Sequence, residues 1–459
     1  MRILILCLGT RGDVEPLLAL GKALQARGHE VTLCAPDNCA RWVREEHGLA
    51  FSALGLDFKA LMQSVEVRAA RGGVEAAIGR AVLAAMPAAL RAASDCAARV
   101  SPQLLLCSVT VPGGPDLAEA HGAALVTAAL APVYPTRRFS FFLAPALPAP
   151  LGWLLNRATY LMPALARSMY GAALAQWRRE ALRLTTRSPM MLEMGCRIDG
   201  SVAPRMCCAS PSVVPPPSDW DAATTTMTGY WRLEEQAQWA PGAALAAFLA
   251  AARAAARPAV YVGFGSMTRV EPAALAAIVL PALRQAGVRA VLQLGWSGSS
   301  SSSSSSSGGG GGGGGGEEQD VFYLDEPVPH AALFPLMAAV VHHGGAGTTA
   351  AGLAAGRPTL ICPIGADQFW WGARVHRELR CGPPPVELVC LTPALLAARL
   401  RARVGEEGFH LRAAELAQRI AQEDGLARAV EIIEAEGRRC GKMPPAAAAA
   451  AVAAAAVVP

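Results

Sequence analysis

A glycine-rich turn in the second half of the chain carries residue types suited to holding a phosphate group. An apolar run is followed by His343-Gly344-Gly345-Ala346-Gly347-Thr348-Thr349, where a helix is predicted to begin. Glycines let a ligand approach the backbone, and the free amides and dipole of a helix N-terminus attract anions. His343 can donate to a phosphate oxygen, and the Thr348 and Thr349 hydroxyls are further donors. The alternative is a strand-to-helix turn without a ligand, with Thr349 as N-cap. The segment is neither a P-loop nor a G-x-G-x-x-G motif.

An adjacent acid and amide follow the next predicted strand. Residues 363–372 read P-I-G-A-D-Q-F-W-W-G, which places Asp367 beside Gln368. Because the carboxyl ends of parallel strands meet at one edge of a sheet, we expect this segment near the glycine-rich turn. A carboxylate next to an amide offers acceptors and donors suited to sugar hydroxyls. The alternative is that Asp367 only caps the helix that carries Arg374 and His376.

Strands alternate with helices in both halves of the chain. The apolar run 2–8 is typical of a parallel strand covered on both faces, and a helix ending at Gly28 and a strand over 30–35 complete a βαβ unit. Further strands are predicted at 104–109, 124–128, 259–263, 290–294, 321–324, 338–342 and 359–362, and a helix at 272–286. This alternation predicts an α/β fold of two Rossmann-like, doubly wound domains. In such folds ligands bind at the carboxyl ends of strands, so we expect the active site in a cleft between the domains.

Changes in composition set the predicted domain boundaries. We place an N-terminal domain at 1–212, a linker region at 213–257 that opens with V-V-P-P-P, and a C-terminal domain at 258–440. The C-terminal domain includes a serine and glycine tract at 297–316, which cannot form a core and is expected to loop out dispensably. The Ala-rich tail, 441–459, is expected to be a frayed helix or disordered.

The bulk composition excludes several classes of protein. With 459 residues the chain is too long for one ordinary core, and its net charge of +5 is spread without a Lys/Arg run, which argues against a nucleic-acid partner. The 12 cysteines include no C-x-x-C pair, so we expect free thiols and a cytoplasmic location. Arg11 and Asp13 directly after the first strand argue against a signal peptide. Three prolines within 139–155 argue against a membrane-spanning helix there.

Three motifs, in this order along the chain, resemble those of sterol 3-beta-glucosyltransferases within the UDP-glycosyltransferases. Looser versions mark bacterial enzymes that glycosylate antibiotic aglycones. Residues 9–16 (G-T-R-G-D-V-E-P) resemble the family's amino-terminal signature, and residues 263–267 (G-F-G-S-M) its interdomain motif. Pro329-His330, V-V-H-H-G-G-A-G-T-T-A-A-G-L-A-A-G over 340–356, Asp367-Gln368 and W-G-A-R-V-H over 371–376 resemble its donor-binding segment.

The resemblance implies the GT-B fold and inverting, metal-independent transfer of a hexose, glucose from UDP-glucose, to a hydroxyl of an apolar acceptor such as a sterol. The UDP-sugar is then a co-substrate, and no cofactor is expected. Carried over to this sequence, the resemblance assigns the diphosphate to His343 and to the amides of Gly345, Ala346, Gly347, Thr348 and Thr349. It places Ser266 on the diphosphate from the facing strand end, and Asp367 and Gln368 on the sugar.

The nucleobase site is carried over less directly. The resemblance assigns the base to the backbone of Val328 and places His330 near the ribose or phosphate. Residues 325–329 lack the tryptophan on which many relatives stack the base, and Trp296 is the expected substitute. The alternative for Trp296 is an aromatic side chain packed beside a loop.

Asp13 is the candidate catalytic base. It lies between the first strand and the first helix, and direct displacement at the anomeric carbon requires the acceptor hydroxyl to lose its proton as it attacks. A neighbouring Arg11 would lower the pKa of the carboxyl, so we expect its basicity to come from burial. Thr10 and Arg11 are assigned to the donor. The alternatives are Asp13 as helix N-cap and a plain Arg11–Asp13 pair.

Residues 132–206 are expected to line the acceptor side of the cleft and to admit a flat apolar molecule. They concentrate large apolar side chains, namely Phe139, Phe141, Phe142, Trp153, Tyr160, Met162, Met169 and Tyr170. Apolar pockets with few polar groups suit sterols. The alternative is an ordinary helical core with some peripheral membrane contact, which is compatible with an acceptor that resides in bilayers.

Two other functions fit the predicted fold. One is a protein that binds a nucleotide sugar or a lipid without transferring anything, and the other is a sugar-nucleotide epimerase. The joint presence of Asp13, His343, Asp367 and Gln368 favours a transferase. An epimerase would need further acid and base groups at the sugar, for which the sequence has no motif.

Overall fold

The computed structural model divides into two compact units. Unit 1 comprises Met1–Leu233 together with the chain from Glu423 onward, and unit 2 comprises Glu234–Gln422. The structure describes residues 1–62, 64, 74–144, 151–185, 194–233, 239–265, 272–293, 320–324 and 328–443. The serine and glycine tract and the tail beyond residue 443 lie outside these ranges.

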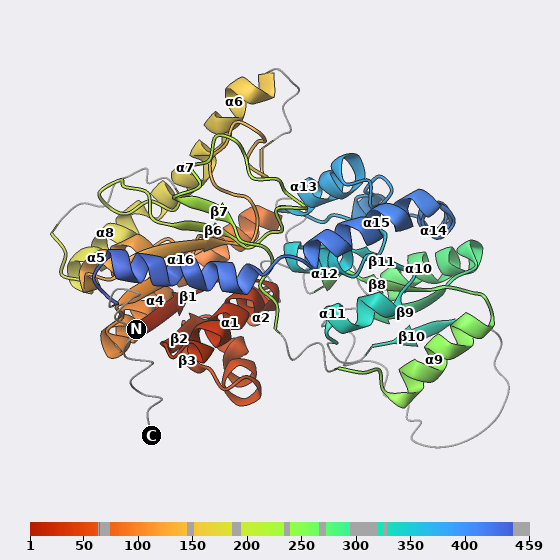
Figure 1. Cartoon of the computed structure of the whole chain (residues 1–459), viewed down its shortest axis with the longest axis horizontal. Helices are drawn as coiled ribbons and strands as arrows, with labels where there is room; N and C mark the ends of the chain where they lie inside the picture. Colours follow the sequence, from red (N-terminus) through yellow and green to blue (C-terminus); the bar gives the residue numbers. More distant parts are fainter. Residues whose placement is uncertain are drawn as a thin grey trace. The chain divides into compact units, whose positions relative to one another are not determined.

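Unit 1 is built on a parallel sheet, and its described strands lie in the order β3-β2-β1-β4-β5-β6-β7 (Figure 1). Alternate side chains of β1 point to opposite faces: Ile3 and Ile5 enter one hydrophobic core, and Leu4 and Leu6 enter the other. A strand buried on both faces must be apolar throughout, which explains the continuous apolar run. The strands are β1 (Arg2–Leu6), β2 (Glu30–Ala35), β3 (Ala50–Ala53), β4 (Leu104–Ser108), β5 (Ala124–Ala129), β6 (Arg205–Cys207) and β7 (Thr225–Met227).

Helices cover both faces of this sheet. The helices α1 (Arg11–Ala26) and α16 (Gly425–Arg439) pack on the face of Ile3 and Ile5. On the opposite face pack α4 (Val74–Val100), α5 (Gly114–His121) and α8 (Gly171–Glu180). Within the described chain, one helical stretch, Gly79–Val100 of α4, is long and apolar enough to cross a membrane. Its buried side chains pack on the sheet, as in a core helix of a folded domain.

Short elements complete unit 1. Two of them, α6 (Leu151–Thr159) and α7 (Leu161–Met169), belong to the long connection between β5 and β6 and rise away from the sheet (Figure 1). The others follow β2 and β3 and are η1 (Asp37–Cys39), η2 (Trp42–Glu46) and α2 (Phe58–Met62).

Unit 2 contains a second parallel sheet, with described strands in the order β10-β9-β8-β11-β12. These are β8 (Ala259–Gly263), β9 (Arg289–Gln293), β10 (Val321–Tyr323), β11 (Ala339–His342) and β12 (Thr359–Ile361). On one face pack α10 (Pro272–Ala286) and α14 (Pro393–Gly405), and on the other α9 (Ala243–Ala254) and α11 (His330–Leu333). The remaining elements are η5 (Phe334–Leu336), α12 (Ala346–Ala354), α13 (Gln368–Ala373), η6 (Arg374–Glu378), η7 (Leu388–Cys390) and α15 (Glu407–Ile420).

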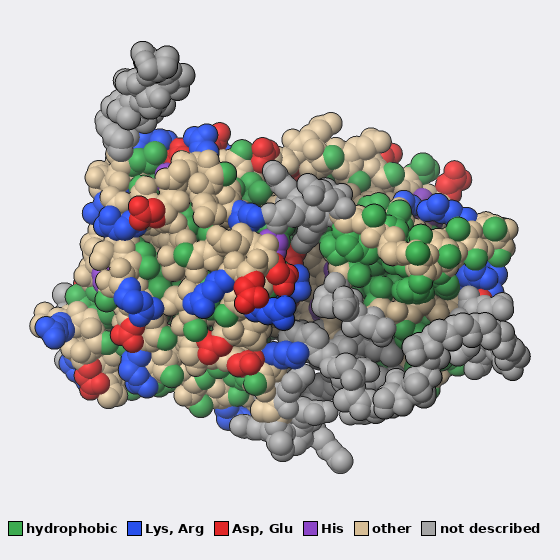
Figure 2. Space-filling view, turned by 90° about the horizontal axis from the view of Figure 1, so that it is seen from below, with side chains coloured by type: hydrophobic (Ala, Val, Ile, Leu, Met, Phe, Trp, Pro, Cys, Tyr) green, Lys and Arg blue, Asp and Glu red, His purple; other side chains and the backbone are tan. Residues whose placement is uncertain are grey.

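The helix α9 shows why the hydrophobic content of the chain is high without a matching large core. It buries Leu245, Leu249 and Ala252, while its exposed positions are mostly alanine. Figure 2 shows green side chains gathered where α9 covers unit 2. Small alanine side chains add little apolar area, so this face is typical of an exposed alanine-rich helix.

The two predicted α/β folds are confirmed, whereas the unit boundaries differ from those placed on the sequence. The proline-rich start of the predicted linker belongs to unit 1, because Val213 and Val214 are fully buried and β7 continues the first sheet. The predicted second domain extended to residue 440, but α16 packs on unit 1. The helix α9, inside the predicted linker, packs on the core of unit 2.

The strand order reverses at one point in each sheet. In unit 1 the chain moves from β1 to β2 on one side and to β4 on the other, and in unit 2 the same holds for β8 with β9 and β11. Open α/β sheets bind ligands outside the carboxyl ends of the strands at such a reversal. A ligand is therefore expected beside the loops after β1, β4, β8 and β11.

Candidate functional site

The strand β11 leads directly into the glycine-rich turn of unit 2, and α12 begins at Ala346. Gly345 occupies the N-cap position, so the alternative of Thr349 as N-cap is wrong. Thr349 is fully buried, and both its amide and its hydroxyl donate to Gly345 O, each at 2.9 Å. Thr349 thus holds the first turn of α12 from inside, and its donors already have a partner.

Three amides at the start of α12 have no acceptor within the part of the chain that the structure describes. Those of Ala346, Gly347 and Thr348 precede any intrahelical acceptor, because the first helix-type bond is made by Thr349 N. Gly347 is exposed, and a Cβ at this position would meet nothing within 4 Å. Among the described residues, the helix therefore presents unpaired N–H groups and its positive end to a space that no other atom fills, which suits an anion.

The His343 side chain is seated between two glycines. A Cβ on Gly265 would stand 2.7 Å from His343 Cε1, and a Cβ on Gly345 would stand 2.7 Å from His343 Nε2. Gly265 also has a φ of +68°, which side-chain-bearing residues rarely adopt. The pairing of Gly263 with His342 in the β8–β11 ladder brings the two segments together. Both glycines are needed for the imidazole to occupy this position.

Burial sets the charge of His343. It lowers the pKa of the imidazole to about 4, so the side chain is neutral at pH 7 and donates one N–H. Its Nδ1 is buried and finds no hydrogen-bond partner among the described residues. A buried polar atom without a partner costs about 1–3 kcal/mol, so a ligand that satisfies it gains that much. The buried Nδ1 of His343 is therefore suited to form a hydrogen bond with a ligand.

His342 is a structural residue of this site that the sequence did not single out. It is fully buried, and its Nδ1 accepts a hydrogen bond of 2.9 Å from Gly344 N. Gly344 has a φ of +98°, so the chain turns sharply there. The signal for this role was present as a second histidine at the end of the apolar run, but its spacing did not distinguish it from His343.

The Asp367-Gln368 pair lies beside the glycine-rich turn, as the shared sheet edge predicts. A Cβ on Gly344 would stand 3.2 Å from both Gln368 Cβ and Gln368 O. Gln368 Oε1 accepts from Ile364 N at 2.7 Å and from Gly365 N at 3.2 Å, so the side-chain amide is held by its own loop. This fixes the carbonyl end and leaves the amide N–H groups as the donors that a ligand can use.

Asp367 occupies the N-cap position of α13, yet its side chain makes no capping bond. Its Oδ2 instead accepts from Trp371 Nε1 at 2.8 Å. Trp371 is buried, so its hydrogen bond fixes the orientation of the carboxylate from the protein interior. The N-cap alternative is therefore correct for the position and wrong for the side chain.

The structure describes some of the residues assigned to the nucleoside and not others. His330 Nε2 lies 3.2 Å from Tyr261 OH, and Tyr261 OH donates to Gln293 Oε1 at 2.7 Å. The His330 ring stacks on Phe334 with 4.5 Å between centroids. Val328 packs against the core beside α9. Ser266 and Trp296, the other two predicted donor contacts, lie outside the described residues.

Asp13 of unit 1 lies at the start of α1, where it closes a capping box with Thr10. Thr10 is the N-cap, so the N-cap alternative for Asp13 is wrong: Asp13 is the third helical residue. Its Oδ2 accepts from Thr10 N at 2.7 Å and from Thr10 Oγ1 at 3.0 Å. A Cβ on Gly9 would stand 2.3 Å from that oxygen, so the carboxylate lies directly over Gly9.

Burial raises the pKa of Asp13, and the two hydrogen bonds from Thr10 oppose this rise only in part. The predicted lowering by Arg11 is not observed. Arg11 Nε instead lies 3.6 Å from Glu15 Oε2, and its guanidinium stacks 4.3 Å above the Trp42 ring. The plain Arg11–Asp13 pair is thus replaced by contacts that leave Asp13 as a half-buried carboxyl of raised pKa.

Two hydroxyls at the end of β4 join this part of unit 1, and the sequence did not indicate them. Ser108 Oγ lies 2.9 Å from Thr110 Oγ1, which donates to Leu8 O at 2.9 Å. They connect the β4 loop to the end of β1 at the reversal of strand order. Nothing in their spacing from Leu8 along the chain suggested this contact.

The aromatic segment that was expected to line the acceptor site divides into two parts. Phe141 and Tyr160 are buried and contact each other at 5.7 Å between ring centroids. Trp153, Met162 and Met169 instead point outward, with 58, 43 and 70 % of their surface exposed. The first part is a structural core, and the second is a surface.

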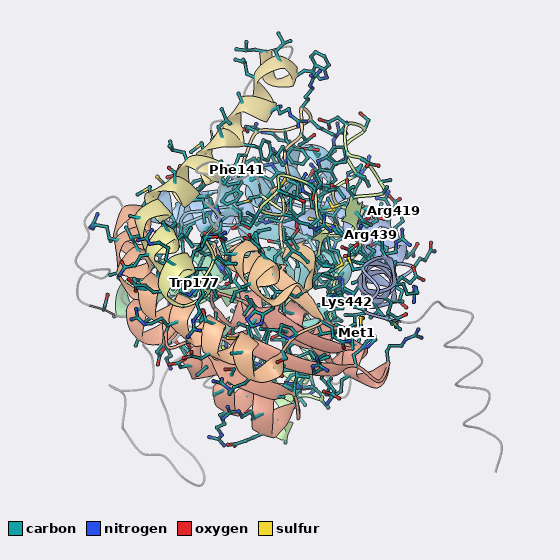
Figure 3. The ribbon with its side chains drawn as sticks, turned by 90° about the vertical axis from the view of Figure 1, so that its left-hand side faces the viewer. Met1, Phe141, Trp177, Arg419, Arg439 and Lys442 are labelled. Atoms are coloured by element: carbon teal, nitrogen blue, oxygen red, sulfur yellow. The ribbon has the colours of Figure 1, made fainter. Side chains whose placement is uncertain are left out.

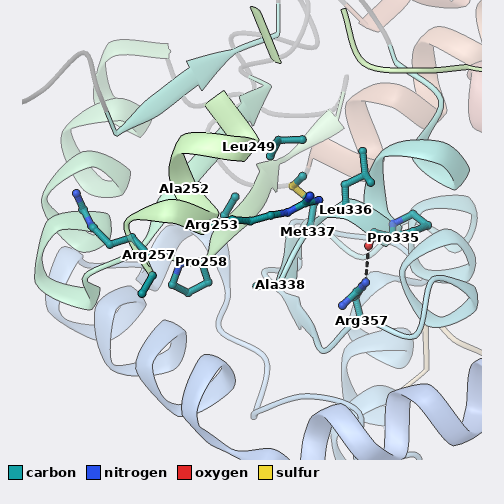
Figure 4. A pocket seen from close by; sticks show the side chains of 12 residues that line it. Leu249, Ala252, Arg253, Arg257, Pro258, Pro335, Leu336, Met337, Ala338 and Arg357 are labelled. Carbon is teal, nitrogen blue, oxygen red and sulfur yellow. Dashed lines mark hydrogen bonds between the residues drawn. The ribbon is translucent and has the colours of Figure 1, made fainter. Parts of the chain in front are cut away.

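A cavity of about 440 Å³ lies elsewhere in unit 2 (Figure 4). It opens at the amino ends of β8 and β11, beside Ala259 and Ala338, and thus at the sheet edge opposite the glycine-rich turn. Arg257 is engaged by Asp320, and Arg357 donates to Pro335 O. Ligands of parallel sheets bind at the carboxyl edge, so this cavity is not part of the candidate site.

Among the described residues, no group of three or more His, Cys, Asp or Glu is placed to hold a metal ion. The groups of the candidate site that are suited to an anion are backbone amides and an imidazole.

Two family models match the chain. The glycosyltransferase family 28 N-terminal domain matches residues 3–140, and the erythromycin biosynthesis protein CIII-like, C-terminal domain matches residues 320–435.

Curated relatives carry a consistent description. A sterol 3-beta-glucosyltransferase of Arabidopsis thaliana is 32 % identical over 441 residues, which cover 94 % of this chain and 67 % of that protein. One of Emericella nidulans is 32 % identical over 451 residues, which cover 94 % of this chain and 30 % of that protein. The chain thus spans about a third of the fungal relative and two thirds of the plant one.

Solved structures share the fold. The glycosyltransferase of kitacinnamycin has a TM-score of 0.63 at 18 % identity and covers 95 % of this chain and 98 % of its own. The glycosyltransferase VinC in complex with dTDP has a TM-score of 0.59 at 19 % identity and covers 96 % of this chain and 100 % of its own. The fold is GT-B, as the motifs predicted.

Proposed function

The chain belongs to the sterol 3-beta-glucosyltransferase family, and from this premise we propose that it transfers glucose from UDP-glucose to the 3-hydroxyl of a sterol. The observation that carries the proposal is the prepared anion site of unit 2. There, the amides at the start of α12 and the buried Nδ1 of the half-buried His343 have no hydrogen-bond partner among the described residues. These groups fit the diphosphate of a nucleotide sugar.

On the donor side, the leaving group is a nucleoside diphosphate, whose charge grows as the glycosidic bond breaks. The positive end of α12 and the His343 N–H favour that growing charge, so they act on the transition state more than on the bound donor. They supply the stabilisation that a divalent cation provides in other transferases, and we propose that no metal is needed. Asp367 and Gln368 hold the sugar hydroxyls beside the diphosphate.

On the acceptor side, Asp13 removes the proton from the sterol hydroxyl as its oxygen attacks the anomeric carbon. The new C–O bond forms on the face opposite the leaving diphosphate, so the α-linked glucose of the donor becomes β-linked in the product. The raised pKa of Asp13 makes it a stronger base than an exposed carboxylate. Thr10 holds the carboxylate by Oδ2, which leaves Oδ1 for the acceptor.

The base specificity of the donor is part of the proposal. The relative VinC was solved with dTDP, whereas UDP is the nucleotide expected from the sequence. We propose a cytoplasmic enzyme in contact with membranes. The 12 cysteines, all unbridged, support a reducing compartment, and the acceptor's residence in bilayers supports the contact.

The proposal is tested by measuring UDP release from UDP-glucose by the full chain with a panel of sterols, long-chain alcohols, flavonoids and sugars. Sterols should give the fastest turnover, EDTA should leave it unchanged, and dTDP-glucose should be a poorer donor. Faster turnover with a sugar acceptor would overturn the acceptor class. UDP binding without any turnover would indicate a binding protein instead of an enzyme.

A further inference from the structure

The helices α6 and α7, here called the α6–α7 arm (Leu151–Met169), stand away from the sheet of unit 1. Figure 3 shows the two yellow helices rising above Phe141 and Trp177, with side chains projecting outward along their length. The arm is nonetheless anchored. Asn156 Nδ2 donates to Arg137 O at 3.0 Å, Phe141 N to Thr159 Oγ1 at 2.8 Å, and Tyr160 OH to Phe139 O at 3.3 Å. These hydrogen bonds fix the arm to unit 1, so its outward face has a defined structure.

The helix α6 has the reverse of the usual distribution for a helix on a soluble domain. Its inward positions are Gly152 and Asn156, which are buried at a spacing of four residues. Its outward positions are Trp153, Leu154 and Leu155, exposed by 58, 64 and 44 %. A helix that packs on a core turns its large apolar residues inward, whereas here a glycine and an amide face the protein.

The helix α7 continues the same pattern. Leu161, Leu165 and Met169 follow one another at a spacing of four and are exposed by 58, 60 and 70 %. On the inward side, Ala164 is buried and Arg167 donates to the buried Asp116 at 3.0 Å. Large apolar side chains that repeat along one outward stripe are characteristic of a contact surface and not of isolated exposed residues.

The charges around the arm have one sign along the sequence. Between Glu119 and Glu180 the chain has no acidic residue, and its arginines in this span are Arg137, Arg138, Arg157, Arg167, Arg178 and Arg179. Arg137, Arg138 and Arg157 are exposed. The Arg137 guanidinium lies 4.8 Å above the Trp153 ring, so a cation and an amphipathic aromatic ring sit together beside the apolar stripe. Asp219, at the foot of the arm, is engaged by Thr136 and the Arg137 amide.

We propose that the α6–α7 arm docks on the surface of a lipid bilayer that contains anionic headgroups. The leucines and methionine enter the boundary between headgroups and acyl chains, and Trp153 lies at the interface. The exposed Arg137, Arg138 and Arg157 contact lipid phosphates. Each helix has nine residues, about half of what a span requires, so the arm lies on the membrane and does not cross it. A second copy of the chain would bring two arginine-rich arms together, which their like charge opposes.

Flotation of the full chain with vesicles tests this surface independently of sterol transfer. The chain should float with vesicles of phosphatidylcholine and phosphatidylserine, and less with phosphatidylcholine alone. The variant L154Q/L161Q/L165Q, which changes only outward positions, should reduce the partition coefficient at least about tenfold. Arg138→Gln with Arg157→Gln should reduce it about fivefold per arginine on anionic vesicles only. The matched control is V389Q/L411Q, because Val389 and Leu411 are exposed by 86 and 56 % in unit 2.

The outcomes distinguish a lipid surface from a second copy of the chain as the partner of the arm. Loss of flotation in the arm variant, with an unchanged melting temperature, unchanged UDP affinity and normal flotation of the control, supports the proposal. Equal flotation of the arm variant and the natural chain overturns it. Absence of flotation together with a dimer in analytical ultracentrifugation that the arm variant dissociates also overturns it, in favour of a second copy. Failure of sterol turnover with intact flotation would contradict the proposed function alone.

Discussion

The environment of Asp13 favours its role as a base and at the same time lowers the stability of the folded chain. As a base it benefits from the partial burial that raises its pKa, whereas for stability a desolvated carboxylate is unfavourable at neutral pH. Because its pKa is above the unfolded value, its contribution to stability is fully present below the unfolded pKa and is lost as the pH rises through the folded pKa.

The variant Asp13→Asn separates these demands, because the amide oxygen can still accept from Thr10 N. We expect glucosyl transfer to fall about 10²- to 10⁴-fold, the usual range for a general base. We also expect the melting temperature to rise at pH 8, with the gain disappearing toward pH 4. Thermal melts across this range, with transfer rates measured alongside, check both parts. A lower melting temperature at pH 8 would mean that the Thr10 bonds outweigh the burial of charge.

His343 makes the reverse linkage. Its pKa of about 4 lies below the ordinary value, so the folded state resists protonation and the chain loses stability as the pH falls from about 6.5 toward 4. In His343→Ala this acid sensitivity should be smaller, and UDP affinity should fall by about 1–2 kcal/mol, the loss of one hydrogen bond to a charged group. Calorimetric titration at pH 7 measures the affinity. His410→Ala, on α15 of the same unit, is the control and should bind UDP normally.

At the scale of elements, the strands were predictable and the helix ends were not. The apolar runs around β1 and β8 located both sheets, because a strand covered on two faces has no other composition open to it. The N-caps at Thr10 and Gly345 depend on the backbone angles of single residues, which periodicity does not determine. The sequence also could not predict that the His343 ring lies between Gly265 and Gly345. Gly265 comes close to His343 only because β8 pairs with β11.

The open space over the start of α12 leads to a prediction about that helix. Gly347 and Gly408 are each the second residue of their helix, both exposed, and a Cβ on either would meet nothing within 4 Å. Alanine at either position should leave the stability unchanged or raise it by up to about 1 kcal/mol through lower backbone entropy of the unfolded chain. If a phosphate occupies the space over α12, however, Gly347→Ala alone should weaken UDP binding. Equal UDP affinity in both variants would place the diphosphate elsewhere.

At the scale of the whole molecule, the sequence could not assign the last helix to a unit. The helices α15 and α16 are both amphipathic and follow each other closely, so either could cover either sheet. What decides is complementarity that only the fold reveals. Ile433 enters the core of unit 1, and Glu434 binds Arg27 at 3.2 Å. The proline-rich segment at 213–217 misled the boundary for the same reason, since proline marks an irregular backbone and not a domain limit.

This assignment predicts that two similar substitutions destabilise different units. Ile433→Ala in α16 and Leu416→Ala in α15 each remove a side chain that is at most 1 % exposed, and each should cost about 2–5 kcal/mol. Hydrogen–deuterium exchange should speed up in β1 and α1 for the first variant and in unit 2, around α12, for the second. Added UDP should slow the faster exchange in Leu416→Ala and leave the exchange of Ile433→Ala in β1 and α1 unchanged. Faster exchange around α12 in Ile433→Ala would contradict the division into units.

The most direct measurement of the central claim is the structure of the product formed from UDP-glucose and a sterol. Mass spectrometry and proton NMR of the purified product should show one hexose on the sterol 3-hydroxyl, with the anomeric coupling of a β-linkage, and Asp13→Asn should form the same product at least about 10²-fold more slowly. An α-linked product would contradict direct displacement with Asp13 as the base. The absence of any steryl glucoside, together with glucosylation of another acceptor, would contradict the assignment of a sterol as the acceptor.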